Sequence, residues 1–285
     1  MKDQNNLRVE DPEDPEEWFD LGVRLGEKGD LIECIEAFKK GLKLNPRDVT
    51  AWINLGVAHG QNGDSQAEIE AYKKALQLDP TNVEVWVNLG VVYEEIDNFK
   101  KAIDAYKKAL ELDSEDSDIW FDLGVALERM EEYEKAIKAY KKALAINPND
   151  AQAFLNFGVA QIQMDNYEEA LKAFKKALEI DPNDEKAWYN LGLTLGLTGN
   201  VDEEIKSYRK ALELDSEIEL AWYNLAVALE KKEDYERAIE AYRKVIELNP
   251  EDDETWEDLS IVLRKVGDHE GAIKAQNKAK LLRKE

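Results

Sequence analysis

The sequence predicts an all-α fold in which one helical hairpin is stacked on itself many times. No insertion or deletion interrupts a period of 34 residues, and such a period is typical of a solenoid array rather than of a single globule. Two stretches with helical spacing of apolar residues lie within each period, which predicts two helices per repeat. The period is marked by one aromatic residue per repeat, at Trp18, Trp52, Trp86, Trp120, Phe154, Trp188, Trp222 and Trp256.

We expect eight repeats over residues 15–285, each numbered here from position 1 to position 34. Residues 1–14 are rich in Asp, Glu and Asn and poor in apolar residues, which predicts a flexible acidic leader. That stretch has no apolar run, so we do not expect a secretory signal. The repeats start at Pro15, Val49, Val83, Ser117, Ala151, Glu185, Glu219 and Asp253.

The first helix of a repeat carries a glycine at position 8. Glycine inside a helix costs ~1 kcal/mol relative to alanine, so its recurrence indicates a close approach by a neighbouring helix. We expect small residues such as Ala102 and Ala136 to face it, with the aromatic residues at position 24 filling the larger gaps. The glycines are Gly22, Gly56, Gly90, Gly124, Gly158 and Gly192.

The turn and the second helix have their own signals. Pairs such as Gly29-Asp30, Asp97-Asn98, Gly199-Asn200 and Gly267-Asp268 are expected to cap the second helix with a side-chain oxygen. That helix should end before the Asn-Pro or Asp-Pro pair of its repeat, because proline cannot continue a helix. Ser114 and Ser216 replace this proline, so we expect looser joints there. The pairs begin at Asn45, Asp79, Asn147, Asp181 and Asn249.

The pattern Trp-x-x-Leu-Gly, followed by Ala, Tyr or Phe, Ala and Pro, resembles the tetratricopeptide repeat over residues 15–285. The resemblance implies a right-handed α-α superhelical solenoid of helix-turn-helix repeats. It also implies that the first helices line a concave groove that binds a peptide segment of another protein. Cys34, Glu68 and Glu204 depart from the pattern at the small-residue position 20. We expect the two carboxylates to turn outward to water or, failing that, to splay their repeats, because lone burial is costly.

Composition excludes several classes of function. The net charge of −24 opposes binding to nucleic acid and to anionic membranes, so the expected partners are neutral or basic proteins. Cys34 is the single cysteine. The sequence contains no run of 18 apolar residues, so we expect no membrane span. A cytoplasmic location is expected by default.

The sequence contains few residues suited to catalysis or to metal binding. His59 and His269 stand on different repeats, and the glycines do not cluster into a phosphate-binding loop. We therefore expect no enzyme, no catalytic residue, no cofactor and no metal site.

Position 6 is the leading candidate for a binding site. Asparagine is a poor helix-interior residue, so its recurrence there predicts a ladder of amides that bond to a peptide backbone. The competing interpretation is that these amides cap or bridge neighbouring helices. The asparagines are Asn54, Asn88, Asn156, Asn190 and Asn224.

Apolar residues at positions 5 and 9 extend this candidate site. Phe121, Tyr189 and Tyr223, at position 5, are expected to supply specificity. An exposed apolar strip marks an interaction site. Packing against the next repeat is the competing interpretation, and it is stronger for position 9 than for position 5.

Charge along the expected groove is uneven. Acids, among them Asp122, gather in the first half, whereas Lys186 and Lys231 stand in the second. We expect a partner segment with basic residues near repeats 1–4 and apolar or aromatic residues near repeats 5–7. Phe19 and Val23 stand where co-chaperone relatives carry the Lys and Asn that help to grip a terminal carboxylate, so that mode is not expected.

The function predicted from the sequence is a non-catalytic scaffold or adaptor that binds an extended peptide of a partner protein. One alternative is a structural solenoid that self-associates through its terminal repeats, because the last repeat has no separate polar capping helix. A second alternative is an engineered, consensus-like array without a natural ligand, which the uninterrupted period favours.

Overall fold

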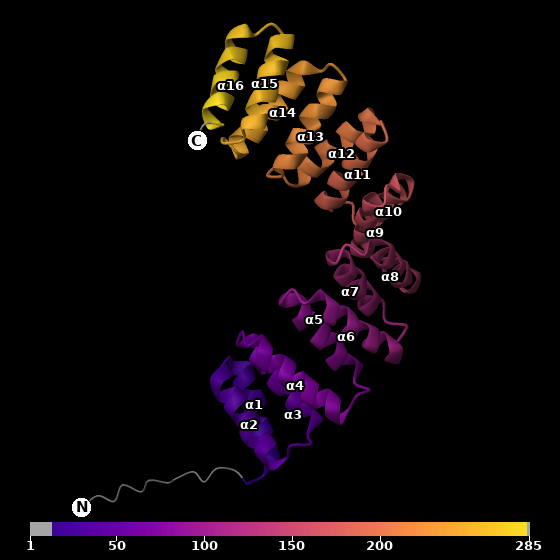
Figure 1. The fold of residues 1–285 in the computed structure, drawn as a ribbon, viewed down its shortest axis with the longest axis vertical. Coiled ribbons are helices and arrows are strands. Elements are labelled where there is room, and N and C mark those ends of the chain that lie inside the picture. Colours follow the sequence, from indigo (N-terminus) through magenta and orange to yellow (C-terminus); the bar gives the residue numbers. More distant parts are fainter. Residues whose placement is uncertain (1–12, 284–285) are drawn as a thin grey trace, which may run out of the picture. The chain divides into compact units, whose positions relative to one another are not determined.

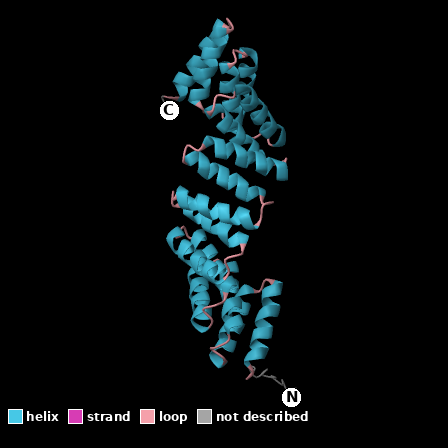
Figure 2. Ribbon diagram, turned by 90° about the vertical axis from the view of Figure 1, so that its right-hand side faces the viewer, coloured by secondary structure: helices cyan, strands magenta, loops and turns pink. Residues whose placement is uncertain are grey.

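The computed structural model describes residues 13–283, and these residues form sixteen α-helices and no strand (Figures 1 and 2). The predicted all-α solenoid of helix pairs is confirmed. The expected leader, residues 1–14, lies outside the described residues except for Glu13 and Asp14. The first helices of the repeats are α1 (Pro15–Lys28), α3 (Val49–Gln61), α5 (Val83–Glu95), α7 (Ser117–Arg129), α9 (Ala151–Gln163), α11 (Glu185–Leu197), α13 (Glu219–Lys231) and α15 (Asp253–Lys265). The second helices are α2 (Leu31–Leu44), α4 (Ser65–Leu78), α6 (Phe99–Leu112), α8 (Tyr133–Ile146), α10 (Tyr167–Ile180), α12 (Val201–Leu214), α14 (Tyr235–Leu248) and α16 (His269–Leu282).

The chain divides into two compact parts, an N-terminal half (Met1–Glu132) and a C-terminal half (Tyr133–Glu285). Within each half, every helix packs against the helices before and after it. Neighbouring first helices also touch, as α1 does with α3 and α11 does with α9 and α13. The first helices therefore lie on the crowded side of each stack, and we call their outward side the first-helix face.

The glycine at position 8 lies under the aromatic ring at position 24 of its own repeat. A Cβ atom on Gly56 would come within 2.5 Å of the Tyr72 ring, and one on Gly90 within 2.4 Å of the Tyr106 ring. The prediction of a close helix approach is therefore correct, but its predicted partner is wrong. The ring, and not an alanine, occupies the space that the missing methyl group leaves.

The recurring tryptophan holds the loop between repeats. The indole Nε1 of Trp52 donates a hydrogen bond to the carbonyl oxygen of Pro46 at 3.0 Å. Trp120 and Trp222 make the same bond to Ser114 and Ser216, each at 2.9 Å. The two joints without proline therefore keep the same tryptophan hydrogen bond as the joints with proline. This bond gives no sign of the expected loosening.

The turn inside each repeat contains one residue in the left-handed conformation. Four are glycines, such as Gly63 with φ 79°, and four are acidic residues, such as Asp97 with φ 56° and Glu233 with φ 61°. The predicted side-chain caps are correct for Asp268, which accepts a bond from the backbone N–H of Gly271 at 2.9 Å. They are wrong for Asp30, Asn98 and Asn200, whose side chains make no capping bond.

Replacing an acidic residue in these turns by glycine should stabilise the fold. An L-residue pays a steric penalty in the left-handed region that glycine avoids, so Asp97→Gly and Glu233→Gly should each raise the unfolding free energy by about 0.5–1 kcal/mol. Urea unfolding followed by circular dichroism measures this. The matched control is Gly63→Ala, which should lower the same quantity. Unchanged or lower stability of both glycine variants would contradict the strain argument.

Candidate functional site

The five asparagines at position 6 share one environment: each side chain is half-buried. Asn156 and Asn190 line the same hollow, of about 460 Å³, between α9 and α11. Tyr189 and Val159 line it with them. Asn54 lines a smaller hollow of about 270 Å³ between α1 and α3. The register thus brings amide groups and apolar side chains together on the first-helix face of each half.

Local bonds use part of the hydrogen-bonding capacity of these amides. Asn190 donates from Nδ2 to the carbonyl oxygen of Lys186 at 2.8 Å, and Asn156 accepts from Gln152 at its Oδ1, at 3.0 Å. Asn224 donates to the Tyr189 hydroxyl at 3.3 Å. A side-chain amide offers two donor hydrogens and two acceptor lone pairs, so each of these three retains capacity for a guest.

Apolar exposure on this face comes from position 9 more than from position 5. Val23 is 43% exposed, whereas Phe19 is 8% exposed and packs against Phe38. Our expectation that packing against neighbours matters more at position 9 is therefore wrong for this repeat. The reason is that the position 5 side chain lies toward the ring at position 24 of its own repeat.

The predicted specificity residues at position 5 are half-buried, as is the nearby Asp122. Tyr223 donates its hydroxyl to Asp258 at 2.9 Å, which links two successive first helices. The ring of Tyr189 lies 5.9 Å from that of Tyr208. These contacts hold Tyr189 and Tyr223 in place within the C-terminal half. Phe121 and Asp122 lie in the N-terminal half.

Five repeats contain a buried tyrosine at position 24, and each also contains one glutamate at position 12 or position 20. The two repeats with phenylalanine at position 24 have no glutamate at either place. The Tyr242 hydroxyl, for example, donates to Glu230 at 2.7 Å. Our sequence reasoning missed this pattern, although comparing these three columns would have found it. The pairs are Tyr72 with Glu68, Tyr106 with Glu94, Tyr140 with Glu128, Tyr208 with Glu204, and Tyr242 with Glu230.

The carboxylates at position 20 are buried, which corrects the expectation that they turn outward. Glu68 is 7% exposed and Glu204 is 3% exposed. A Cβ atom on Gly60 would lie 2.6 Å from the Glu68 carboxylate, and one on Gly196 would lie 2.5 Å from that of Glu204. Glycine at position 12 therefore makes the space, and these hairpins pack as closely as the others instead of splaying.

Cations of the next repeat balance these carboxylates in the C-terminal half. Lys231 Nζ lies 3.5 Å from Glu204, and Lys265 Nζ lies 3.0 Å from Glu230. Both lysines stand at position 13 and reach back along the first-helix face. The C-terminal half thus neutralises much of the charge that it buries there.

Glu68, in the N-terminal half, faces an acid of the next repeat instead of a lysine. Glu95 stands at the corresponding position beside Glu68, and burial together with this like charge raises the pKa of Glu68. Burial, then the charge of Asp122, raises the pKa of Glu94 to about 7, although Arg129 opposes the shift. Burial and the neighbouring Asp118 raise the pKa of Asp122 to about 6. The N-terminal half therefore presents acids that favour a cation from outside.

Moving the carboxylate from position 20 to position 12 of one repeat gives a direct test of this arrangement. Glu68→Ala leaves the Tyr72 hydroxyl without its acceptor, and Gly60→Glu drives a second carboxylate against Glu68. Each change alone should lower the unfolding free energy by about 1–3 kcal/mol. The double variant recreates the pattern of Glu94 and Ala102, and should recover at least about 1 kcal/mol relative to the summed single effects.

Urea unfolding of the four proteins of this double-mutant cycle makes the measurement. Glu70→Ala, an exposed change on the same helix, is the control and should shift stability by less than about 0.5 kcal/mol. Additive effects of Gly60→Glu and Glu68→Ala would show that the two positions do not share one site.

No metal cluster or membrane span is found in residues 13–283. No group of three His, Cys, Asp or Glu side chains there is placed to hold a metal ion. Within the same residues, no helix is both long and apolar enough to cross a membrane.

Comparisons with known proteins agree on one family. The family model described as the Cilia and flagella-associated protein 70 C-terminal domain matches residues 22–247, and the tetratricopeptide repeat model matches residues 220–283. No curated protein sequence matches the chain. Among solved structures, one of MamA is 33% identical with a TM-score of 0.56, covering 57% of this chain and 95% of that one.

Two further structures have the same fold. YrrB, described as a TPR protein with an unusual peptide-binding site, is 25% identical with a TM-score of 0.57, over 73% of this chain and 99% of its own. The C-terminal part of a TPR repeat-containing protein from Cytophaga hutchinsonii is 17% identical with a TM-score of 0.71, over 83% and 97%. With the helix pairs and their repeated residues described above, these matches show that the chain belongs to the tetratricopeptide repeat family.

Proposed function

We propose that this protein is a non-catalytic scaffold that binds an extended peptide segment of a partner protein on its first-helix face. The observation that carries this proposal is the row of half-buried amides at position 6, two of which share the hollow between α9 and α11. That hollow, of about 460 Å³, has the size and mixed lining of a ligand site. Interaction with other proteins is the general role of the family, and YrrB is described as peptide-binding.

The charges of the two halves favour a partner segment with two kinds of residue. Basic side chains suit the N-terminal half, where they would supply the charge that Lys231 and Lys265 supply in the C-terminal half. Apolar or aromatic side chains suit the hollow beside Tyr189 and Val159. A cytoplasmic location stays a prediction.

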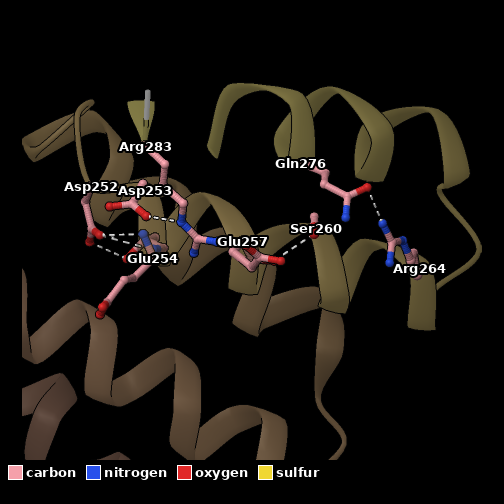
Figure 3. A network of polar contacts seen from close by, with 9 residues as sticks. Asp252, Asp253, Glu254, Glu257, Ser260, Arg264, Gln276 and Arg283 are labelled. Atoms are coloured by element: carbon pink, nitrogen blue, oxygen red, sulfur yellow. Dashed lines mark hydrogen bonds and ion pairs between the residues drawn. The ribbon is translucent and has the colours of Figure 1, made fainter. Parts of the chain in front are cut away.

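Self-association through the last repeat is the alternative that one observation favours. Ile273 is 57% exposed, whereas the equivalent Ile239 in the preceding repeat is 7% exposed, so the end of the stack leaves an apolar side chain uncovered. The surrounding residues oppose an apolar stack. Gln276 takes the place of the buried aromatic residue and accepts a bond from Arg264 at 2.8 Å (Figure 3). Lys280 takes the place of a leucine.

Arg283 adds to the polar character of this end. Its guanidinium bonds to Asp253 at 2.5 Å and to Glu257 at 2.8 Å (Figure 3). Light scattering over a concentration series separates the two functions, because stacked growth would raise the apparent mass. The absence of a natural ligand, as in an engineered array, stays the third interpretation.

Removing two amides from one hollow should weaken peptide binding. Peptides selected by phage display on the full chain should lose about tenfold in affinity for Asn156→Ala with Asn190→Ala, because two backbone hydrogen bonds are lost. Fluorescence anisotropy makes this measurement. The control is Asn149→Ala with Asn183→Ala, which removes two exposed loop amides. Equal affinity of the Asn156→Ala, Asn190→Ala variant and the control would contradict the proposal, as would an affinity that does not change with salt concentration.

Binding of a basic segment should release protons near pH 6.5. In the free protein the pKa of Glu94 is raised to about 7 and that of Asp122 to about 6, so both are partly protonated there. A bound cation favours the ionised forms and lowers both pKa values. Affinity should therefore fall as the pH falls from 8 to 5.5, by at least about threefold.

Calorimetry at pH 6.5 in buffers of different ionisation enthalpy measures the released protons. Glu94→Gln with Asp122→Asn should abolish the dependence on buffer. A buffer-independent binding enthalpy in the unmodified protein would show that these carboxylates do not meet the partner's cations.

A further inference from the structure

One hollow of the N-terminal half lies away from the first-helix face. It has a volume of about 710 Å³ and opens between the second helices α4 and α6. Its floor is formed by Trp86, Leu89 and Tyr93 of α5. Comparable hollows of about 660 Å³ and 400 Å³ open between second helices of the C-terminal half.

The rim of the α4–α6 hollow is positive although the chain is strongly acidic. Four lysines and two acids, Asp104 and Glu111, line it. Lys73, Lys101 and Lys107 have no ion pair within the described part of the chain, whereas Lys108 pairs with Glu111 at 2.6 Å. The net charge of −24 makes such a concentration of unpaired cations unusual for this surface.

Two of these lysines are placed against the aromatic floor. The ammonium of Lys101 lies 5.3 Å from the centre of the Tyr93 ring, and that of Lys73 lies 5.8 Å from it. Both are within the range of cation–π attraction, which holds the charges at the mouth of the apolar hollow. An apolar floor and cationic rim therefore form one surface.

A substitution on α4 makes this hollow more positive than the α12–α14 hollow. Gln77 stands at position 29, where Glu111, Glu179, Glu213 and Glu247 stand in other repeats. In the α12–α14 hollow, four cations on the rim face three acids, Glu213, Glu240 and Glu247. The α4–α6 hollow has the same number of cations and one acid fewer.

We propose that the α4–α6 hollow binds an acidic linear segment of a partner protein. The segment carries one aromatic or large aliphatic side chain, which seats on Trp86 and Tyr93, and its carboxylates contact Lys73, Lys101 and Lys107. Charge complementarity argues for this occupant, because with four lysines and two acids on the rim a basic or neutral segment would leave positive charge uncompensated. The site is separate from the first-helix face, so one chain holds two segments of opposite charge.

The test uses a fluorescein-labelled peptide EDEFLEDE and the full chain, read by fluorescence anisotropy. Saturable binding is expected. The triple variant Lys73→Gln, Lys101→Gln and Lys107→Gln should weaken it by about tenfold, because each rim charge contributes modestly. Lys43→Gln, Lys138→Gln and Lys142→Gln remove the same charge from lysines that line none of these hollows, and should change the affinity by less than about twofold. Circular dichroism checks that both triple variants keep their helices.

Two further measurements test whether an apolar side chain enters the hollow and whether the hollow is separate from the first-helix face. The peptide EDESSEDE, which lacks the apolar pair, should bind more weakly than EDEFLEDE. Asn156→Ala with Asn190→Ala should leave the affinity for EDEFLEDE unchanged, whatever happens to segments on the first-helix face.

Four outcomes would overturn the proposal. These are no saturable binding of EDEFLEDE, equal binding of EDEFLEDE and EDESSEDE, and equal loss in the two triple variants, which would indicate unspecific attraction. The fourth is that the unmodified chain self-associates in sedimentation and the triple variant Lys73→Gln, Lys101→Gln and Lys107→Gln does not. This result would make a second copy of the chain the occupant.

Discussion

The close contact between a glycine backbone and an aromatic ring, repeated along the chain, is the constraint on which the rest of the structure depends. Where Gly56 lies under Tyr72, a methyl group would come within 2.5 Å of the ring, so glycine lets these two helices approach this far without moving the ring. The contact sets the level of the ring along the first helix. It thereby places the tyrosine hydroxyl beside positions 12 and 20, where a carboxylate can meet it from either helix.

The placement of that carboxylate explains why two halves built from the same repeat differ in charge. Lys231 and Lys265 reach back from the following repeat to Glu204 and Glu230. In the N-terminal half, Glu95 stands in the same place beside Glu68, and Asp122 lies near Glu94. For Glu68 and Glu204, the residue at position 13 of the following repeat thus decides whether the buried acid faces a like charge or a balancing cation of the same chain.

Crowding of the first helices and divergence of the second helices give the two sides of the repeat different surfaces. The first helices α9 and α11 touch, and the polar side chains of Asn156 and Asn190 at their surface line one shared hollow. The second helices leave deeper spaces in which Trp86 and its equivalents form an apolar floor. The same tryptophan bonds through its indole to the preceding loop, so one residue both closes the joint and lines a hollow.

The sequence by itself determined the period, the helix pairs, the ends of the second helices and the family, because these depend on turn residues, prolines and apolar spacing within short stretches. It also placed the asparagines in one register. Tertiary structure decided three other features: the burial of Glu68 and Glu204, the aromatic ring that contacts the glycines, and the greater exposure of Val23 than of Phe19. Each depends on how much space a residue of another helix leaves. Gly60 gives Glu68 that space, and no local rule in the sequence couples residues on two packed helices.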